Sequence, residues 1–345
     1  MGLPETALAE GAQTLASMQT EQPIPEPTHS SLAICICTFM RPDGLQRLLA
    51  GLDGQTFTVT PQPRVQLIVV DNSPTGSAAA TCAAQTTRWP LQYLHEPRPG
   101  ISYARNTALA AVAPDTDFIA MIDDDEVPAP DWLDQLLDAQ TRSGADIIVG
   151  PTTPVFPPQT PDWIKASGFF IKPENGASLC DLDPDPPAAT CNVLVRADLL
   201  GPSGLSFEPA LALSGGEDKL LFQSLKQCGY RFAWANAAQV SEWIPAERAN
   251  LSYMWRESYR RGCVKYFVKR RLKSRSNLDA LRIALRLTLK SAGRIAWYLL
   301  RMLASAGRKS SAWVPHALRI ADNLGTIAGV LQIPNRHYRH KDAAC

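Results

Sequence analysis

Three consecutive carboxylates, Asp123, Asp124 and Asp125, directly follow the apolar run 118–122, and Glu126 adds a fourth acid. An apolar run that ends abruptly in charge is typical of a buried strand. Two like charges about 4 Å apart repel by roughly 4 kcal/mol at an effective dielectric of 20. We therefore expect a positive group here, and a divalent metal with a diphosphate fits that chemistry. A solvated acidic turn that caps the next helix is the alternative.

Two further polar positions lie at the ends of other predicted elements. Asp71 ends the apolar run 65–70, where its carboxylate could accept hydrogen bonds from a base or a ribose; an Asx turn is the alternative. Arg105 lies near the start of the Ala-rich helical segment 101–112, where it could meet a phosphate or form a surface salt bridge. Because ligands of open α/β sheets bind at the carboxyl ends of strands, we expect these groups to share one edge.

The segment 215–218, Gly-Gly-Glu-Asp, opens a predicted helix that runs to about Cys228. Two glycines allow close backbone approach, and two acids follow at the start of the helix. A group transfer to a hydroxyl needs a positioned base, which an acid beside flexible glycines can supply. The alternative is N-capping with favourable charge on the helix dipole.

These residues need a scaffold, and the hydrophobic pattern predicts one. Predicted strands cover residues 32–37, 65–70, 91–95, 117–122, 146–149, 191–195, 231–234 and 239–243. Predicted helices cover residues 43–54, 75–88, 101–112, 130–143 and 214–228. This alternation indicates an α/β fold with a mainly parallel central sheet flanked by helices. Between the fifth and sixth strands, residues 150–187 are rich in Pro, and their aromatic residues could line an acceptor cleft or fill a minor core.

Charge divides the 345-residue chain. Of its 34 Lys and Arg residues, 20 lie in 251–345 with only 4 of the 33 acids, which leaves 14 basic and 29 acidic residues in 1–250. A basic region suggests nucleic acid or anionic lipid as a partner. In 281–299, basic residues recur every four positions among many apolar ones, which suits a helix lying in a membrane interface. We therefore expect an anionic membrane surface and no nucleic acid; a helical subdomain packed on the rest of the chain is the alternative.

Other features narrow the class and the compartment. The eight cysteines lack metal-binding spacing and indicate reduced thiols in a cytoplasmic protein, with Cys35 and Cys37 on one face of a strand. Residues 1–30 are acidic and Pro-rich without the core of a signal peptide, so we expect a disordered extension. The helix around 281–299 is too interrupted by charge to span a bilayer, and the uncharged run 323–335 is too short to do so. The chain has no Walker-type loop, nucleophile motif or paired histidines, which argues against triad hydrolases.

Taken in order, these segments resemble glycosyltransferase family 2, the inverting nucleotide-sugar enzymes with a GT-A fold. The resemblance runs from about residue 32 to about residue 262. In detail, the chain is similar to the bacterial branch of the family that includes succinoglycan glucosyltransferases. Its carrying residues are Ile36 to Pro42, Val69 to Asn72, Ile101 to Asn106, Asp123 to Glu126, Thr190 to Asn192 and Gly215 to Asp218.

The resemblance implies how a UDP-sugar donor would be held. Thr38 and Asp71 would contact the uridine, and Arg105 would lie beside the nucleotide. Asp123 would lie near the ribose or the sugar. In an extended chain the side chain of Asp124 would point to the face opposite that of Asp123 and Asp125, so its role in donor binding would be the least defined.

The resemblance also implies the chemistry. Asp125 would ligate Mg²⁺ or Mn²⁺, Asp218 would be the catalytic base, and Glu217 would help to hold the acceptor. Relatives often carry His in the segment corresponding to 240–243, where this chain has Ser241, so a metal or phosphate contact from that position is not expected.

Together, the sequence patterns and the resemblance predict a disordered extension over 1–30, a GT-A domain over 31–250 and a basic amphipathic helical region over 251–345. The expected activity is a metal-dependent, inverting transfer from a UDP-sugar, with UDP-glucose one candidate. The acceptor would be a hydroxyl of a lipid-linked oligosaccharide in exopolysaccharide or cell-surface polysaccharide synthesis, at the inner face of the plasma membrane. A non-catalytic nucleotide-sugar-binding or scaffold subunit of a biosynthetic complex is the alternative.

Overall fold

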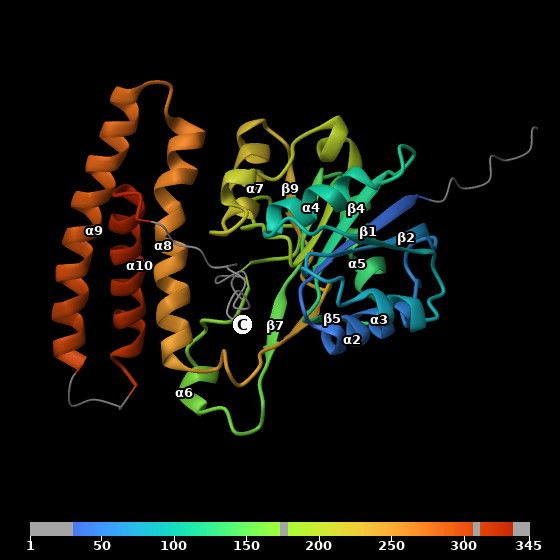
Figure 1. Ribbon diagram of the computed structural model, residues 1–345, viewed down its shortest axis with the longest axis horizontal. Coiled ribbons are helices and arrows are strands. Elements are labelled where there is room, and N and C mark those ends of the chain that lie inside the picture. The colour runs from blue at the N-terminus through green and yellow to red at the C-terminus, as the bar shows by residue number, and fades with distance from the viewer. Residues whose placement is uncertain (1–29, 173–178, 306–310, 334–345) are drawn as a thin grey trace, which may run out of the picture.

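The computed structural model describes residues 30–172, 179–305 and 311–333. They form an α/β body with a group of three long C-terminal helices beside it (Figure 1). The strands are β1 (Ser31–Thr38), β2 (Arg64–Asp71), β3 (Leu91–His95), β4 (Phe118–Asp123), β5 (Glu126–Pro128), β6 (Ile147–Val149), β7 (Thr152–Val155), β8 (Asn192–Arg196), β9 (Phe232–Trp234) and β10 (Val240–Trp243). The helices are α2 (Pro42–Asp53), α3 (Ala79–Ala84), α4 (Ile101–Ala110), α5 (Trp132–Ser143), α6 (Asp162–Lys165), α7 (Glu217–Gln227), α8 (Leu251–Lys273), α9 (Asn277–Ser305) and α10 (Val314–Val330), with 3-10 turns at Ala197–Leu199, Gly201–Ser203 and Pro209–Leu211. Of the predicted disordered extension, residues 1–29 lie outside the described residues.

The main sheet has seven strands in the order β3-β2-β1-β4-β8-β6-β9. It is mainly parallel, as predicted, but β8 runs antiparallel to both β4 and β6. The predicted last strand does not join it: β10 pairs with β5 and β7 in a separate three-stranded sheet. The parallel register sets Thr38 opposite Asp71 and Cys37 opposite Asp123, so the ends of β1, β2 and β4 share one edge.

Helices cover both faces of the main sheet because alternate residues of each strand point to opposite faces. Ile34 and Ile36 of β1 pack in the core under α2 and α5, whereas Ala33 and Cys35 pack in the core under α4 and α7. Cys37 lies against the same core as Cys35, which confirms that the two thiols share a face.

The predicted helix over 75–88 is wrong at both ends, because only Ala79–Ala84 is helical. The carboxylate of Asp71 accepts the backbone N–H of Ala78 at 2.6 Å and holds the preceding residues as a loop. On the other side, Trp89 precedes Pro90, and a residue before proline disfavours helical geometry.

The aromatic residues of 150–187 build a minor core. Phe170 is buried and packs with Ile244 and Met254, and Trp163 and Phe169 lie against the same cluster. Phe170 also stands edge-on to Phe169, with 5.0 Å between the ring centroids. Of the two readings of this segment, the structure therefore favours a minor core, which joins the loop after β7 to α8.

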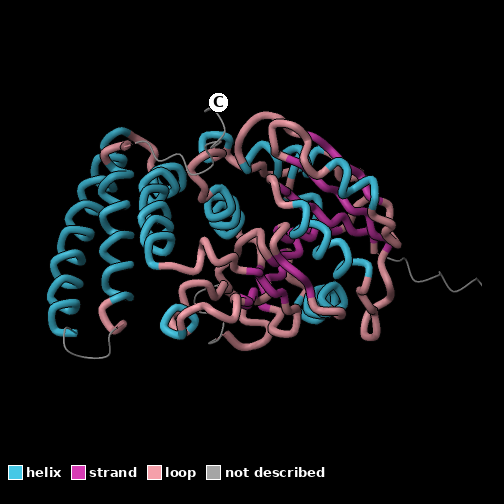
Figure 2. The backbone as a smooth tube through the Cα atoms, turned by 60° about the horizontal axis from the view of Figure 1, so that its bottom comes forward, coloured by secondary structure: helices cyan, strands magenta, loops and turns pink. Residues whose placement is uncertain are grey.

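The C-terminal helices pack through a seam of glycines. α8 contacts α10 along their length, and α9 lies on α10 (Figure 2). A Cβ added at Gly325 of α10 would overlap the carbonyl oxygen of Tyr259 in α8, and one added at Gly262 of α8 would overlap the carbonyl oxygen of Asp322. Lys265 and Asp322 form an ion pair beside this seam. The two helices can approach this closely only without side chains at the contact.

Replacing Gly325 by Ala is therefore expected to destabilise the helical group by about 1–3 kcal/mol, the usual cost of overpacking. Gly293→Ala in α9 is the matched control, because nothing lies within 4 Å of its added Cβ. That change should be neutral or slightly stabilising, since Ala favours a helix by about 1 kcal/mol over Gly. Urea unfolding of both variants measures the difference, and equal midpoints would contradict the packing.

The helical group contacts the body through α8. Val264 and Val268 of α8 pack against Leu211 and Leu220, which flank the start of α7. Within the described residues, none of the helices has the length and apolar content needed to cross a membrane.

Candidate active site

The start of α4 is tied to the end of β2 by a residue next to Asp71. The Asn72 side chain donates to the carbonyl oxygens of Glu96 and Arg98, at 2.7 and 2.8 Å, and accepts the N–H of Gly100 at 3.0 Å. Gly100, at φ 129°, lets the chain turn into α4 where an added Cβ would meet Ala212 at 2.7 Å. This bracing fixes the first turns of α4, which carry Arg105.

Asp71 closes the loop after β2. Its Oδ1 accepts the N–H of Ser73 at 2.8 Å, its Oδ2 accepts the N–H of Ala78 at 2.6 Å, and the Tyr93 hydroxyl donates to it at 3.3 Å. The side chain is fully buried. The geometry is that of the Asx turn left open by the sequence, so Asp71 shapes the edge where a nucleotide would lie.

Asp124 joins the ends of β1 and β4. It accepts hydrogen bonds from the Thr38 hydroxyl and from Arg41, both at 2.8 Å, and a longer one from the N–H of Phe39 at 3.4 Å. Both Asp124 and Thr38 are buried. Burial raises the pKa of Asp124 to about 6, and the neighbouring Asp125 adds to this while Arg41 opposes it. Asp124 and Thr38 therefore stabilise the edge formed by the ends of β1 and β4 from inside the protein.

Asp125 lies between two arginines. Its Oδ2 accepts Nη1 of Arg41 at 2.8 Å and Nη1 of Arg248 at 3.0 Å. Burial raises the pKa of Asp125, whereas the positive charge of Arg41 lowers it. No sequence pattern pointed to Arg248, which follows β10 in a loop. Arg41 lies three residues after the end of β1 and could have been suspected.

A second layer of charge lies behind the acidic edge. Glu126 and Glu242 face each other across β5 and β10, and Lys172 pairs with Glu242 at 2.8 Å. Glu126 accepts the N–H of Asp123 at 2.8 Å with one oxygen, while its other oxygen is buried without a hydrogen bond. Burial and the charge of Asp123 raise the pKa of Glu126 well above its usual value. Ser241 lies next to Glu242 in β10, half-buried, opposite Val127.

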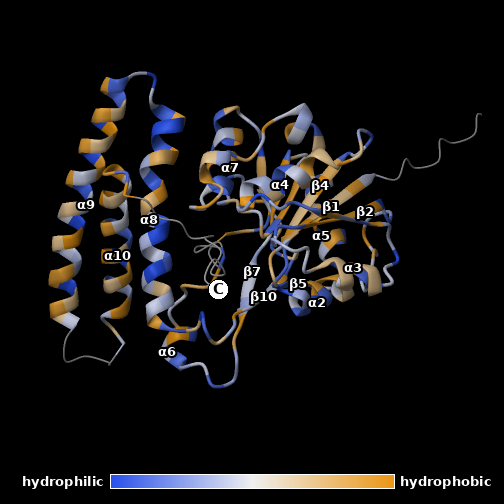
Figure 3. Ribbon diagram, viewed as in Figure 1, coloured by the Kyte–Doolittle hydropathy of each residue, from blue (hydrophilic) through white to orange (hydrophobic). Residues whose placement is uncertain are grey.

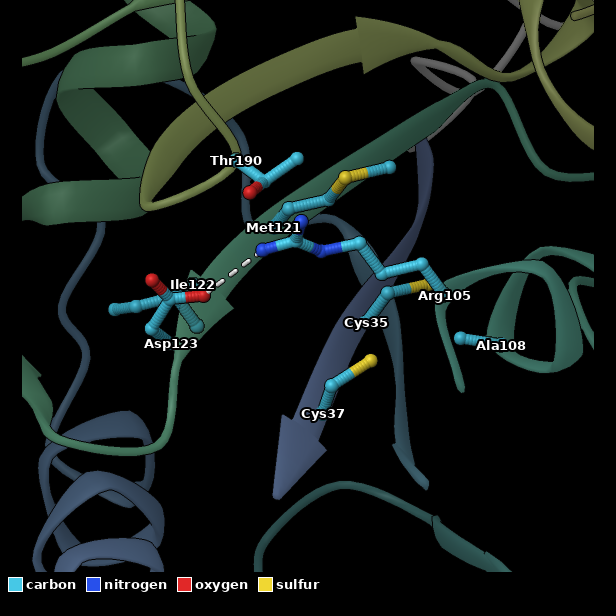
Figure 4. A pocket seen from close by; sticks show the side chains of 8 residues that line it. All are labelled: Cys35, Cys37, Arg105, Ala108, Met121, Ile122, Asp123 and Thr190. Carbon is cyan, nitrogen blue, oxygen red and sulfur yellow. Dashed lines mark hydrogen bonds and ion pairs between the residues drawn. The ribbon is translucent and has the colours of Figure 1, made fainter. Parts of the chain in front are cut away.

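Arg105 links the acidic edge to the second acidic motif. Its Nη2 pairs with Asp123 Oδ1 at 3.4 Å (Figure 4). Its Nη1 pairs with Glu217 at short range. The guanidinium also lies over the ring of Phe207, 5.5 Å from its centroid. One residue along, Asn106 forms two 2.8 Å hydrogen bonds with the backbone of Phe207. α4 therefore carries the arginine and also fixes the segment that leads to Glu217.

The glycines before Glu217 have a structural reason. Gly215 and Gly216 have φ values of 77° and 88°, a left-handed conformation that favours glycine. They also lie under α8: an added Cβ at Gly215 would overlap the guanidinium of Arg260, which donates to the carbonyl oxygen of Ser214 at 3.1 Å. The sequence predicted close backbone approach here, and the partner that approaches is α8.

The two acids that follow differ in environment. Glu217 is buried, and burial raises its pKa to about 7, against the charge of Arg105, which lowers it. Asp218 is half-buried and accepts the N–H of Lys219 at 2.6 Å. Glu217 is therefore held inside, while Asp218 is the acid of this motif that solvent can reach.

A small pocket lies where Arg105 meets the ends of β1 and β4 (Figure 4). It is lined by Cys35, Cys37, Arg105, Ala108, Met121, Ile122, Asp123 and Thr190. Burial raises the pKa of the Cys37 thiol to about 12, so this thiol is protonated at neutral pH. The described cysteines are all free, as the sequence predicted.

The donor set at the edge suits a hard divalent cation. Carboxylate oxygens are the ligands that Mg²⁺ and Mn²⁺ prefer, and Asp123, Asp124 and Asp125 bring three carboxylates together at this edge. Within the described ranges no three His, Cys, Asp or Glu side chains form a ready-made metal cluster. The residues therefore fit a cation held by one or two carboxylates with substrate phosphates completing its shell, as Mg²⁺ is often bound.

Comparison with known proteins agrees with this architecture. Residues 33–200 match the family described as Glycosyl transferase family 2. The chain is 32% identical over 237 residues to the succinoglycan biosynthesis protein ExoM of Rhizobium meliloti (strain 1021), which covers 66% of this chain and 72% of ExoM. ExoW of the same organism is 33% identical over 119 residues, 34% of this chain and 36% of ExoW. The mannosyltransferase PcManGT from Pyrobaculum calidifontis, solved with GDP-Man and Mn²⁺, shares the fold with a TM-score of 0.58 at 16% identity over 95% of both chains.

The mainly parallel sheet, its acidic edge and this likeness define a GT-A fold. The matches to the family and to ExoM show that the protein is a glycosyltransferase. More narrowly, the chain belongs to glycosyltransferase family 2.

Proposed function

We propose that the chain transfers a sugar from a UDP-sugar to a hydroxyl group with inversion at the anomeric carbon. The observation that carries the proposal is Arg105, which joins Asp123 on the donor side to Glu217 on the acceptor side. A buried guanidinium between two acidic motifs 94 positions apart in the chain sets the distance across which donor and acceptor would meet. UDP-glucose is one candidate donor.

Each side of the site would have its own task. Arg41 and Arg248, which hold Asp125, can turn their positive charge toward a diphosphate, for which arginine is well suited. Asp123, the most accessible of the three acids, would contact the ribose or the sugar. Asp71, Thr38 and Asp124 would shape the nucleotide edge from below.

Asp218 would take the proton from the acceptor hydroxyl as that oxygen attacks the anomeric carbon on the face opposite the leaving group. A general base in this position typically contributes a rate factor of about 10²–10⁴. Glu217, held by Arg105, would position the acceptor side of the loop. One displacement of this kind turns an α-linked donor into a β-linked product.

Asp125 would hold Mg²⁺ or Mn²⁺. The cation would neutralise charge on the diphosphate leaving group. The complex of PcManGT with GDP-Man and Mn²⁺ is consistent with this arrangement.

Metal removal tests the proposal. UDP release, measured across a set of UDP-sugars with an acceptor hydroxyl, should stop in EDTA and return on addition of Mn²⁺ or Mg²⁺. UDP binding followed by calorimetry should weaken in EDTA as well, because phosphates would complete the shell of the cation. Full turnover in EDTA would refute the metal role of Asp125, and the absence of turnover with every UDP-sugar would refute the donor class.

The relatives support a setting for this activity. ExoM and ExoW are both named for succinoglycan biosynthesis, which supports a role in exopolysaccharide or cell-surface polysaccharide synthesis. The acceptor would then be a lipid-linked oligosaccharide at the cytoplasmic face of the plasma membrane. In this proposal residues 31–250 are the GT-A domain, and residues 251–345 bring it to the membrane.

A further inference from the structure

The outer side of α9 carries an apolar stripe. Its members are exposed between 56% and 68%, and they recur every three or four residues through the first half of the helix and again near its end. A spacing of three and four places residues on one face of a helix. We call these residues the leucine stripe: Leu278, Leu281, Leu285, Leu289, Leu300 and Leu303. Figure 3 shows hydrophobic residues along α9, the outermost helix of the C-terminal group.

The stripe faces away from the other helices. Ala280, Leu287 and Ser291 of α9 are buried. At 100° per residue, Leu287 lies about 200° around the helix from Leu285. Packing against α10 and α8 therefore uses one side of α9, and the described part of the chain leaves the leucine stripe uncovered.

A row of positive charge runs beside the stripe. Each of the first three members follows a leucine of the stripe by one position, which places it about 100° further around the helix. We call these residues the basic row: Arg282, Arg286, Lys290 and Arg294. All four are exposed, and Asp279 is the single acid of α9. Trp297, also exposed, lies on the side of the basic row.

From these observations we propose that the leucine stripe and the basic row form the docking surface for an anionic lipid bilayer, with α9 lying in the plane of the interface. An apolar face beside a basic face is the arrangement of interfacial helices. The 29 residues of α9 extend for about 43 Å at 1.5 Å per residue, so the stripe makes a long, shallow contact.

Charge favours a bilayer over a second copy of this chain. A pair of α9 helices packed stripe to stripe would bring two basic rows together, with one acid on each helix to offset them. An anionic surface instead attracts every member of the row. A bilayer also needs no side chain of fixed shape or polarity, and all six members of the stripe are leucine.

The docking surface would be connected to the site of the proposed sugar transfer through α8. α9 packs on α10, α10 packs on α8, and α8 covers the Gly215–Gly216 turn with Arg260 and Val264. A bilayer held by α9 would therefore orient the acceptor side of the site toward the membrane. This consequence rests on the proposed function, whereas lipid binding itself does not.

Vesicle flotation of the full chain tests the surface without any sugar transfer. The wild-type protein should float with vesicles of phosphatidylcholine and phosphatidylglycerol. The double variant Leu285→Asp, Leu289→Asp should lose at least about tenfold in partition, because both side chains would enter the apolar layer. Val59→Asp is the matched control, since Val59 is 59% exposed on the α/β body and lies far from the stripe in the sequence. It should float like the wild type.

A second pair of changes separates charge from apolar contact. Arg286→Glu with Lys290→Glu should weaken binding to vesicles that contain phosphatidylglycerol and should remove the preference for them over pure phosphatidylcholine. Thermal unfolding should stay unchanged in all variants, since every altered side chain is exposed.

Three results would overturn the proposal. The wild type could remain unbound to anionic vesicles, or the Leu285→Asp, Leu289→Asp variant could bind them as well as the wild type. Light scattering could also show a wild-type dimer that this variant splits, which would assign the stripe to a second copy. If the wild type bound anionic vesicles but turned over no UDP-sugar, the result would contradict the proposed function and not the docking surface.

Discussion

Asp218→Asn is expected to abolish sugar transfer and to leave UDP binding largely intact. The amide cannot take a proton from the acceptor, so turnover should fall by at least about 10²–10⁴-fold. The local structure should persist, because the amide oxygen can still accept the N–H of Lys219 that Asp218 accepts at 2.6 Å. UDP release measures the first effect, and calorimetric titration with UDP measures the second.

Asp198→Asn provides the matched control, since Asp198 is an exposed acid paired with Arg196 on the surface. Its turnover should equal that of the wild type. Wild-type turnover by Asp218→Asn would remove the assignment of Asp218 as base. If Asp218→Asn lost UDP binding together with turnover, the result would instead indicate that Asp218 contacts the donor.

The sequence predicted the edge of the site because the edge follows from local patterns. Short apolar runs that end in Thr38, Asp71 and Asp123 imply parallel strands, and parallel strands bring their carboxyl ends together. The register confirms this, with Thr38 opposite Asp71 and Cys37 opposite Asp123. Alternation of strand and helix carried enough information for the fold class as well.

Side-chain partners far apart in the chain could not be read from the sequence. Arg248 reaches Asp125 across 123 positions, from a loop with no periodic pattern. Lys172 reaches Glu242 from the end of the Pro-rich segment, where spacing carries no information about distance. The roles inside the acidic run were equally hidden, because the way each carboxylate turns depends on Arg41 and Arg105, which no spacing rule connects to it.

The packing of the C-terminal helices shows the same limit. Periodicity predicted an amphipathic helix over 281–299, and α9 confirms it. The close contact of α8 and α10 depends on Gly262, Gly325 and Gly329 meeting opposite backbone of the partner helix. Isolated glycines inside helical segments indicate a close contact but do not name its partner.

Arg105→Met is expected to lower the free energy of unfolding by about 3–5 kcal/mol and to abolish transfer. The change leaves the buried carboxylate of Glu217 without its cation, and removal of one partner from a buried ion pair typically costs this much. Asp123 also loses its contact with the guanidinium. Urea unfolding and UDP release measure the two losses.

The loss of stability should depend on pH. Burial already raises the pKa of Glu217 to about 7, and removal of Arg105, which lowers it, raises the pKa further. A carboxyl group with a higher pKa in the folded state than in the unfolded state binds protons more tightly when folded, so acidification stabilises the folded state. The stability deficit of Arg105→Met should therefore shrink as the pH falls toward about 7, through the higher pKa that Glu217 has in the variant, and should stay constant at lower pH, where Glu217 is protonated in both folded proteins. A deficit that does not change between alkaline pH and pH 7 would contradict the pairing of Arg105 with Glu217.

The double variant Arg105→Met, Glu217→Gln separates stability from chemistry. Replacing both partners of a buried ion pair by uncharged groups is often nearly neutral, because no uncompensated charge remains in the interior. This variant should recover most of the lost stability, and its unfolding should lose the pH dependence described above. Transfer should not recover, since neither Asp123 nor the loop that carries Asp218 regains the arginine between them. Recovery of transfer together with stability would show that Arg105 acts only on the fold and has no part in placing the two acidic motifs.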